Sequence, residues 1–294
     1  MSGKKDKPIN ILIIDDDNEY VNDSLQVKAR PHRIKLIHEQ NLETAKEYLI
    51  SNKGRYIAGV ILDVLCLKTK EQEVPDKSFI TEAIKYFETT HPRLPKAVLT
   101  GEPDEYRNLK DLYQGTYEIF DKGSGENDLL NYLKAEAKQL EHIKFGSEFP
   151  DLFEIFEKEY LEANFLDEII KCISEMSSSD SVVQKRTLSC IRRIQEEVYI
   201  TINRKHPAII PTEFISDGVK CNKIMKHLFE NGHTERRGII NQFSWPIYQI
   251  TSDFGSHSPV QNPKYYISRY TVQALLFSLF DLLLWFKASI EAEP

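Results

Sequence analysis

Five side chains in the first half of the chain have the chemistry needed to handle a phosphoryl group. They are Asp15, Asp16, Asp63, Thr100 and Lys122. Adjacent carboxylates repel each other unless a cation neutralises them, and Mg²⁺ is a cation that prefers oxygen ligands. A carboxylate such as Asp63 can act as a nucleophile toward phosphorus. A lysine and a metal ion can stabilise the charge on a transferring phosphoryl group, and a hydroxyl can hydrogen-bond one of its oxygens.

These side chains form a site only if the fold brings them together, and each lies at or beside the end of an apolar run. Short runs rich in Ile and Val are typical of strands buried on both faces of a parallel sheet. Helical patterns separate the runs, which predicts an α/β sheet covered on both faces. The carboxyl ends of parallel strands share one edge, where ligands bind. The expected strands are 11–14, 33–38, 58–65, 96–102 and 117–124. The expected helices begin near residue 18 and span 41–50, 76–90, 103–115 and 126–142, with Asn41 as a plausible cap of the helix at 41–50.

Taken singly, each residue also has a simple structural explanation. Asp17, next to the acidic pair, is a plausible cap for the helix that follows, and Asp63 could cap a helix as well. Thr100 could be an ordinary hydroxyl at a strand end, and Lys122 a solvated surface lysine. We favour a functional site because the residues are expected at one edge of one sheet.

The segments "ILIIDDD", "VILDVL", "AVLTGE" and "FDKGS" occur in an order that resembles the receiver domain of bacterial two-component response regulators, over roughly residues 8–143. The resemblance implies a five-stranded flavodoxin-like fold in which Asp63 takes a phosphoryl group from a histidine kinase, a phosphotransfer protein or a small donor. It also implies Mg²⁺ held by Asp15, Asp16, Asp63 and the backbone carbonyl of Leu65. Thr100 and Lys122 would sense the phosphorylated state, and no catalysis beyond phosphoryl transfer to Asp63 and self-dephosphorylation is expected.

The chain departs from the family pattern at three places. The segment after Asp63, "LCLKTKEQEVPDKS", is longer and more charged than is usual, and the turn there lacks the Pro and Gly that the family usually has. Gly123 follows Lys122 where the family mostly has a proline. Ile119 stands where an aromatic residue that takes part in switching is common.

The second half of the sequence predicts a different kind of domain. We place a receiver domain at 1–145 and an all-α output domain at 146–294, joined by a short linker, "KFGSEFPD", at 144–151. Within the output domain, "SSSD" (177–180) indicates a break and a cap before a helix that runs to about residue 205, and 246–254 suggests another helix. The second half has no helix-turn-helix signature and no motif of an enzymatic output. We therefore expect a phosphorylation-controlled helical domain used for protein interaction or dimerisation.

An alternative function is an RNA-binding or RNA-cleaving output. The segment from Tyr248 to Phe286, a polar stretch followed by a long apolar helix, faintly resembles the end of HEPN-like helical domains. His257 is the candidate site residue in this alternative. Active members carry an arginine a few residues before the histidine, and none precedes His257, so we favour a structural histidine.

The uninterrupted apolar core of the segment "TVQALLFSLFDLLLWF" (271–286) is too short to span a bilayer, because Asp281 breaks it. We expect it to be the central helix of the output domain, with part of its surface in a homodimer and Asp281 paired with a hydroxyl or an arginine.

Composition narrows the possible ligands and the cellular location of the protein. The net charge is −7 and neither half is basic, which counts against DNA binding. Cys66, Cys172, Cys190 and Cys221 form no metal-ligand pattern, and the charged N-terminus is not a signal peptide, so we expect a cytoplasmic protein.

Overall fold

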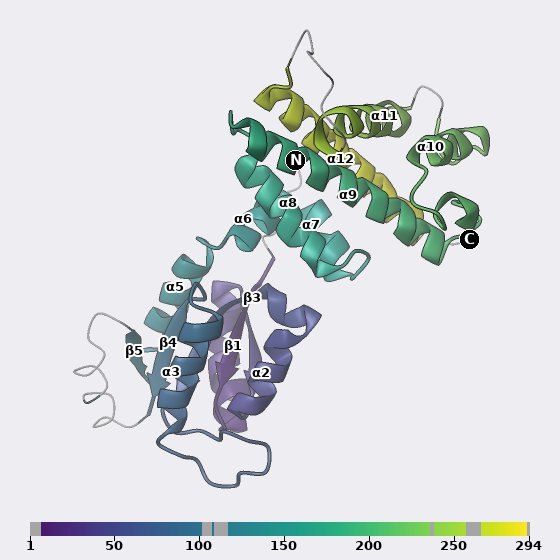
Figure 1. Ribbon diagram of the computed structural model, residues 1–294. Coiled ribbons are helices and arrows are strands. Elements are labelled where there is room, and N and C mark those ends of the chain that lie inside the picture. The colour runs from purple at the N-terminus through teal and green to yellow at the C-terminus, as the bar shows by residue number, and fades with distance from the viewer. Residues whose placement is uncertain (1–6, 102–107, 109–116, 236–237, 257–265, 293–294) are drawn as a thin grey trace. The chain divides into compact units, whose positions relative to one another are not determined.

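The computed structural model describes residues 7–101, 108, 117–235, 238–256 and 266–292. The chain divides into two compact units, Met1–Glu148 and Phe149–Pro294, which we call unit 1 and unit 2 (Figure 1). Unit 1 contains a sheet between helices, and the described part of unit 2 is built from helices.

The predicted five-stranded parallel sheet is present in unit 1. Its strands are β1 (Ile9–Ile14), β2 (Ile34–Glu39), β3 (Ile57–Asp63), β4 (Lys96–Thr100) and β5 (Glu118–Asp121), in the spatial order β2-β1-β3-β4-β5. All pairings are parallel, and every residue of the central strand β3 is buried. The register places Asp63 opposite Leu99 and Thr100 opposite Asp121, so the carboxyl ends of the strands meet along one edge.

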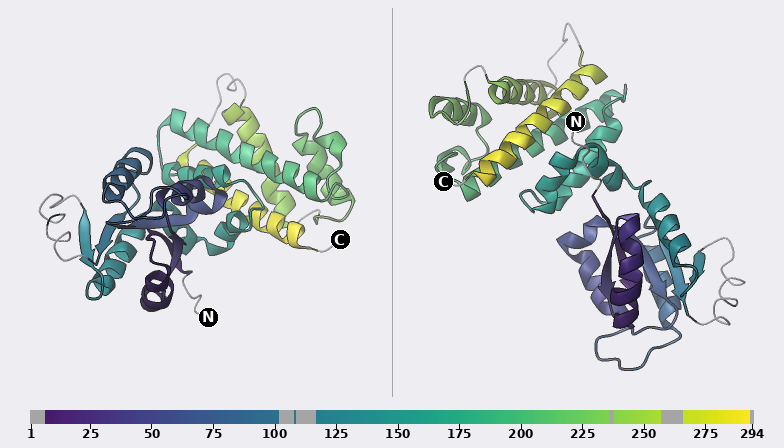
Figure 2. Two further views of the ribbon diagram at one scale, coloured as in Figure 1. Left: turned by 90° about the horizontal axis from the view of Figure 1, so that it is seen from below. Right: turned by 180° about the vertical axis from the view of Figure 1, so that it is seen from behind.

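Helices cover both faces of this sheet (Figures 1 and 2). One face packs on α2 (Leu42–Ile50) and α3 (Phe79–Thr90), and the other on η1 (Tyr20–Leu25), α1 (Gln26–Ala29) and α5 (Glu126–Ala137). Two short helical turns, η2 (Arg30–His32) and η3 (Asn52–Tyr56), lead into β2 and β3. The sequence-based helix near residues 103–115 lies, apart from residue 108, outside the described residues.

The long segment after Asp63 folds back on the start of α2. The Leu67 and Lys68 carbonyls accept hydrogen bonds from the Leu42 and Glu43 N–H groups, at 3.1 Å each. The Asn41 side chain accepts a bond from Thr44 N–H at 2.9 Å, which confirms Asn41 as the predicted cap. Helix N–H groups in the first turn have no partner within the helix, so this segment supplies acceptors that the helix itself lacks.

The linker predicted at 144–151 is wrong, because that segment is mostly helical. The helix expected at 126–142 is two helices, α5 and α6 (Glu141–Glu148), and Gly146 lies inside α6. Pro150 occupies the first turn of α7 (Pro150–Glu157). A proline is tolerated there because the N–H it lacks would have no partner in the helix.

Unit 2 is organised around two long helices, α9 (Ser181–Lys205) and α12 (Arg269–Glu291), which pack against each other and against α11 (Ile239–Thr251) (Figure 1). The predicted break before α9 is confirmed, with the Asp180 carboxylate accepting from Val182 N–H at 2.7 Å. The other helical elements are α8 (Ala163–Glu175), η4 (Thr212–Phe214), α10 (Cys221–Glu230) and η5 (Ser252–Ser256). The helix suggested at 246–254 begins earlier than expected and carries Pro246 inside it.

The apolar helix α12 is central to unit 2, as predicted. Among the described helices it is the one long and apolar enough to cross a bilayer, a criterion that the core helix of a folded domain also meets. Helices α7, α9 and α11 pack on it and bury most of its Leu and Phe side chains. A narrow stripe stays exposed and includes Phe277 (47%), Leu284 (39%) and Asp281. The carboxylate of Asp281 therefore needs no partner within one chain.

Candidate functional site

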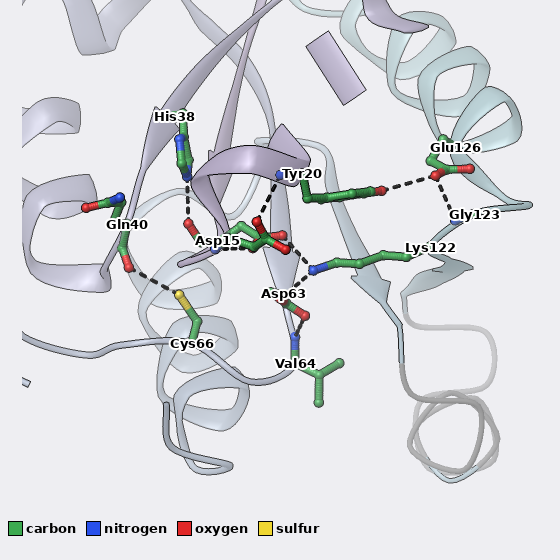
Figure 3. Close-up of polar contacts among 11 residues, drawn as sticks. Asp15, Tyr20, His38, Gln40, Asp63, Val64, Cys66, Lys122, Gly123 and Glu126 are labelled. Carbon is green, nitrogen blue, oxygen red and sulfur yellow. Dashed lines mark hydrogen bonds and ion pairs between the residues drawn. The ribbon is translucent and has the colours of Figure 1, made fainter. Parts of the chain in front are cut away.

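The sheet edge brings together the acidic residues and the lysine that the sequence indicated (Figure 3). Asp15 follows β1, Asp63 ends β3, Thr100 ends β4 and Lys122 follows β5. Asp15, Asp63 and Thr100 are buried, and Asp16 is partly exposed. The Lys122 backbone N–H donates to the Thr100 carbonyl at 2.8 Å, which fixes the start of the Lys122 segment beside β4.

The ammonium of Lys122 bridges two buried carboxylates. Its Nζ lies 2.8 Å from Asp15 Oδ2 and 2.7 Å from Asp63 Oδ2. The other carboxylate oxygens accept backbone N–H groups, from Asp17 to Asp15 Oδ1 at 2.9 Å and from Val64 to Asp63 Oδ1 at 2.6 Å. The bridging ammonium and these hydrogen bonds together offset the cost of burying the two carboxylates.

The three aspartates form a cluster suited to a hard cation. Asp15, Asp16 and Asp63 each offer a carboxylate oxygen, and these three oxygens lie within 4.8 Å of one another. An all-oxygen donor set with two buried members matches the ligand preference of Mg²⁺. The residues present therefore fit a metal ion of this kind. Asp17 has the structural role considered from the sequence, since its carboxylate accepts Tyr20 N–H at 2.9 Å at the start of the following helix.

The electrostatics of the cluster reflect one ammonium shared by several carboxylates. Burial raises the pKa of Asp63 to about 6, the charge of Asp15 adds to the rise, and Lys122 opposes it. Burial alone would lower the pKa of Lys122, but the charges of Asp63 and Asp15 and the hydrogen bonds to them outweigh burial and raise it. Burial likewise raises the pKa of Asp16. The site thus holds more negative charge than Lys122 neutralises, and a further cation would be stabilised there.

Two residues beside Lys122 were not indicated by the sequence. Tyr20 lies with its ring 4.8 Å from Lys122 Nζ, and its hydroxyl donates to Glu126 Oε1 at 3.2 Å. Glu126, which is buried, opens α5 and also accepts Gly123 N–H at 2.7 Å. Tyr20 and Glu126 are 106 positions apart, so only the folded sheet brings them together. The sequence shows Glu126 in the first turn of a predicted helix, but acidic residues are common there because they interact favourably with the helix dipole, so this position alone did not indicate a site.

Thr100, Leu65 and His257 are the remaining residues that the sequence analysis assigned to a site. Thr100 is buried at the expected strand end. The contact between its hydroxyl and a phosphoryl group stays a prediction. The backbone ligand expected from Leu65 also stays a prediction. His257 lies outside the described residues.

Comparison with known proteins gives no further constraint on the family. No protein-family model matches the chain, and no curated protein matches it significantly. The five-stranded parallel sheet and the acidic cluster fit a receiver domain, and this fit rests on the fold and the site geometry.

Proposed function

We propose that unit 1 is the receiver of a two-component response regulator and that phosphorylation of Asp63 controls unit 2. The observation that carries the proposal is the meeting of Asp15, Asp16 and Asp63 with Lys122 at the carboxyl edge of a parallel sheet. Carboxylate nucleophile, cation ligands and ammonium are the groups that phosphoryl transfer to an aspartate requires.

In the proposed reaction an Asp63 carboxylate oxygen attacks the phosphorus of a phosphohistidine or an acyl phosphate. A new O–P bond forms while the P–N or P–O bond to the donor breaks, and the leaving imidazole or carboxylate keeps the electron pair. When held by Asp15, Asp16 and Asp63, Mg²⁺ would neutralise charge on the phosphoryl oxygens. Lys122 supplies a second positive charge on the side of β5. Attack of water on the same phosphorus later releases inorganic phosphate and restores the Asp63 carboxylate.

The neighbours of Asp63 also suggest how the change in charge is sensed. Lys122 Nζ contacts Asp63 Oδ2 directly, and Thr100 is joined to Lys122 through the backbone. A phosphoryl group on Asp63 adds charge and acceptor oxygens at this point. Lys122 and Thr100 are the donors that would shift to hydrogen-bond these oxygens.

We propose that unit 2 acts through protein contacts, with a second copy of the chain as its partner. The support is the exposed stripe of α12, where Phe277 and Leu284 lie one turn to either side of Asp281. Light scattering of the full chain tests this, with Phe277→Ser as the variant and Val182→Ser as the control, because Val182 is an exposed apolar residue of unit 2 outside α12. A wild-type monomer at micromolar concentration, or a dimer unaffected by Phe277→Ser, contradicts the proposal.

The decisive test of the receiver proposal is incubation with acetyl phosphate and Mg²⁺, followed by intact-mass measurement. We expect the wild type to gain one phosphoryl group and Asp63→Asn to gain none. Asp128→Asn is the matched control, since Asp128 is an exposed carboxylate of α5 away from the cluster. No gain in wild type, or equal gain in Asp63→Asn, would falsify the assignment.

A further inference from the structure

The ring of Tyr20 lies against the lysine of the candidate site. Lys122 Nζ is 4.8 Å from the ring centroid while it bridges Asp15 and Asp63 (Figure 3). The face of an aromatic ring carries partial negative charge and attracts an ammonium at this distance. Tyr20 therefore contacts Lys122 on a side that the two carboxylates do not occupy.

The position of the ring is fixed by a buried carboxylate. Glu126 Oε1 accepts the Tyr20 hydroxyl at 3.2 Å and the Gly123 N–H at 2.7 Å, and it lies 3.1 Å from Lys28 Nζ. Burial would raise the pKa of Glu126, but hydrogen bonds from the Gly123 and Glu126 backbone N–H groups and the Lys28 ammonium outweigh burial and lower it. The same oxygen thus ties the ring that contacts Lys122 to the backbone that carries Lys122.

Glycine at position 123 is needed for this arrangement. Its φ of 101° lies in the region that residues with a Cβ rarely adopt. A proline there would fix φ near −65° and would have no N–H to donate to Glu126. The departure from the receiver pattern at this position is therefore linked to the contact between Gly123 and Glu126.

We infer that Tyr20 is a positioning residue for phosphoryl transfer to Asp63: its ring, anchored through Glu126, holds the Lys122 ammonium in line with the acidic cluster. The inference rests on the proposed receiver function and assigns a role that the charged residues alone do not show. A lysine side chain has several rotatable bonds, so holding its ammonium lowers the entropy lost when it meets the transferring group. The ring contributes to the rate and leaves the donor's binding unchanged, because it faces Lys122.

The test compares Tyr20→Leu, Tyr20→Met and Tyr20→Phe in the full chain. Met refills the space without an aromatic face, and Phe keeps the ring without the hydroxyl. Tyr48→Leu is the matched control, since Tyr48 is a half-buried tyrosine of α2 in the same unit. Initial rates of phosphorylation are measured against acetyl phosphate concentration at saturating Mg²⁺, and thermal melting verifies folding.

We expect Leu and Met at position 20 to lower the maximal rate about tenfold, the factor that corresponds to roughly 1.4 kcal/mol. The half-saturating acetyl phosphate concentration should stay within about twofold, which separates positioning from binding. Tyr20→Phe keeps the ring but loses the hydroxyl that Glu126 accepts, so its rate should fall between those of Tyr20→Leu and the wild type. Tyr48→Leu should match the wild type. Equal rates in Tyr20→Leu and wild type overturn the inference, as does a Phe variant as slow as Leu.

A second measurement needs no phosphorylation. The ε-methylene protons of Lys122, beside the ring, should show an upfield ring-current NMR shift in wild type and Tyr20→Phe that disappears in Tyr20→Leu. If this shift is absent in wild type, the positioning role fails even when Asp63 is phosphorylated. If the shift is present but wild type takes up no phosphoryl group, the receiver function has failed and the ring contact is only structural.

Discussion

The two units bury different kinds of polar side chain. Among the described residues, the buried polar set of unit 1 includes four that carry charge: Asp15, Asp63, Lys96 and Glu126. The corresponding set in unit 2 is uncharged, and consists of Gln184, Thr187, Gln195, Thr201, Ser244 and Thr251. Several of these simply bond within their own helix, as Thr187 does to the Val183 carbonyl and Thr251 to the Ile247 carbonyl. Three of the four charged residues buried in unit 1, Asp15, Asp63 and Glu126, lie at or beside the site where chemistry is proposed, whereas Lys96 begins β4 at its other end. Unit 2 buries groups that packing alone accommodates.

The largest expected effect comes from removing the shared ammonium. Lys122→Met leaves Asp15 and Asp63 facing each other, and we expect unit 1 to lose about 3 kcal/mol of unfolding free energy at pH 7.5 in chelator. Mg²⁺ should restore part of the loss. Calorimetric melting measures the loss, with Lys96→Met as the control, because the Lys96 side chain is even more buried than that of Lys122 (8% against 18% exposed) while its partner Glu88 is half-exposed. Equal losses in the two variants would contradict the idea that Lys122 is special.

The next effect has the opposite sign. In chelator at pH 7.5, Asp63→Asn should stabilise unit 1 by about 2 kcal/mol, because one carboxylate fewer shares the ammonium. The pKa of Asp63 is raised from 3.8 to about 6. Between these values the folded state binds the proton more tightly than the unfolded state, so the wild type loses stability as pH rises from about 4 to about 6 and suffers no such loss below pH 4. The advantage of Asp63→Asn should therefore vanish near pH 4. A variant less stable than wild type at pH 7.5 sinks this account of the site.

In unit 2 the expected effects are smaller and do not depend on metal. Asp180→Ala removes the cap of α9 and should lower the stability of unit 2 by about 1 kcal/mol, while Asp180→Asn should retain most of it. Both tryptophans of the chain, Trp245 and Trp285, lie in unit 2, so their fluorescence follows its unfolding in urea. If Mg²⁺ changed the loss of stability caused by Asp180→Ala, the stability of unit 2 would depend on the metal site of unit 1, which contradicts the comparison.

The smallest effect concerns a buried amide. Gln195 Nε2 donates to the Ser244 carbonyl at 2.9 Å and to the Tyr199 hydroxyl at 3.5 Å. Its Oε1 is buried and has no hydrogen-bond partner among the residues that the structure describes. Gln195→Met gives up both hydrogen bonds donated by Nε2 and also removes an unsatisfied acceptor, so we expect a change within about 1 kcal/mol. Urea unfolding should give the same difference at pH 5.5 and pH 8. A pH-dependent difference would indicate an unrecognised charge in the core of unit 2.

The parts of the two units that were predicted from sequence are those with a local signal. The run that ends at Asp63 is apolar throughout, and its β3 strand is buried throughout, so its pattern alone marks it. Asn41 and Asp180 were predicted as caps because each is a short acceptor side chain just before a helical pattern. The acidic cluster followed from strand ends, since parallel topology places them together.

The predictions that were wrong rest on residue types, Gly and Pro, that occur both in loops and at particular helical positions. Gly146 and Pro150 suggested a linker, yet Gly146 is tolerated inside a short helix and Pro150 suits the first helical position. Pro246 lies within α11 for a reason that the local sequence does not reveal. Tyr20 and Glu126 escaped prediction because their contact is tertiary, with no local spacing to signal it.

The separation of the site residues along the chain bears on how the protein is made. Lys122 follows Asp63 by 59 residues, and Glu126 follows Tyr20 by 106. A nascent chain emerges from the ribosome with its N-terminus first, so Asp15, Asp16 and Asp63 are exposed to the cell before their internal counter-ion has been synthesised. During that interval cellular cations are the available neutralising charge. The last strand of the sheet, once released, brings the ammonium to the carboxylates and to the ring of Tyr20 in one step.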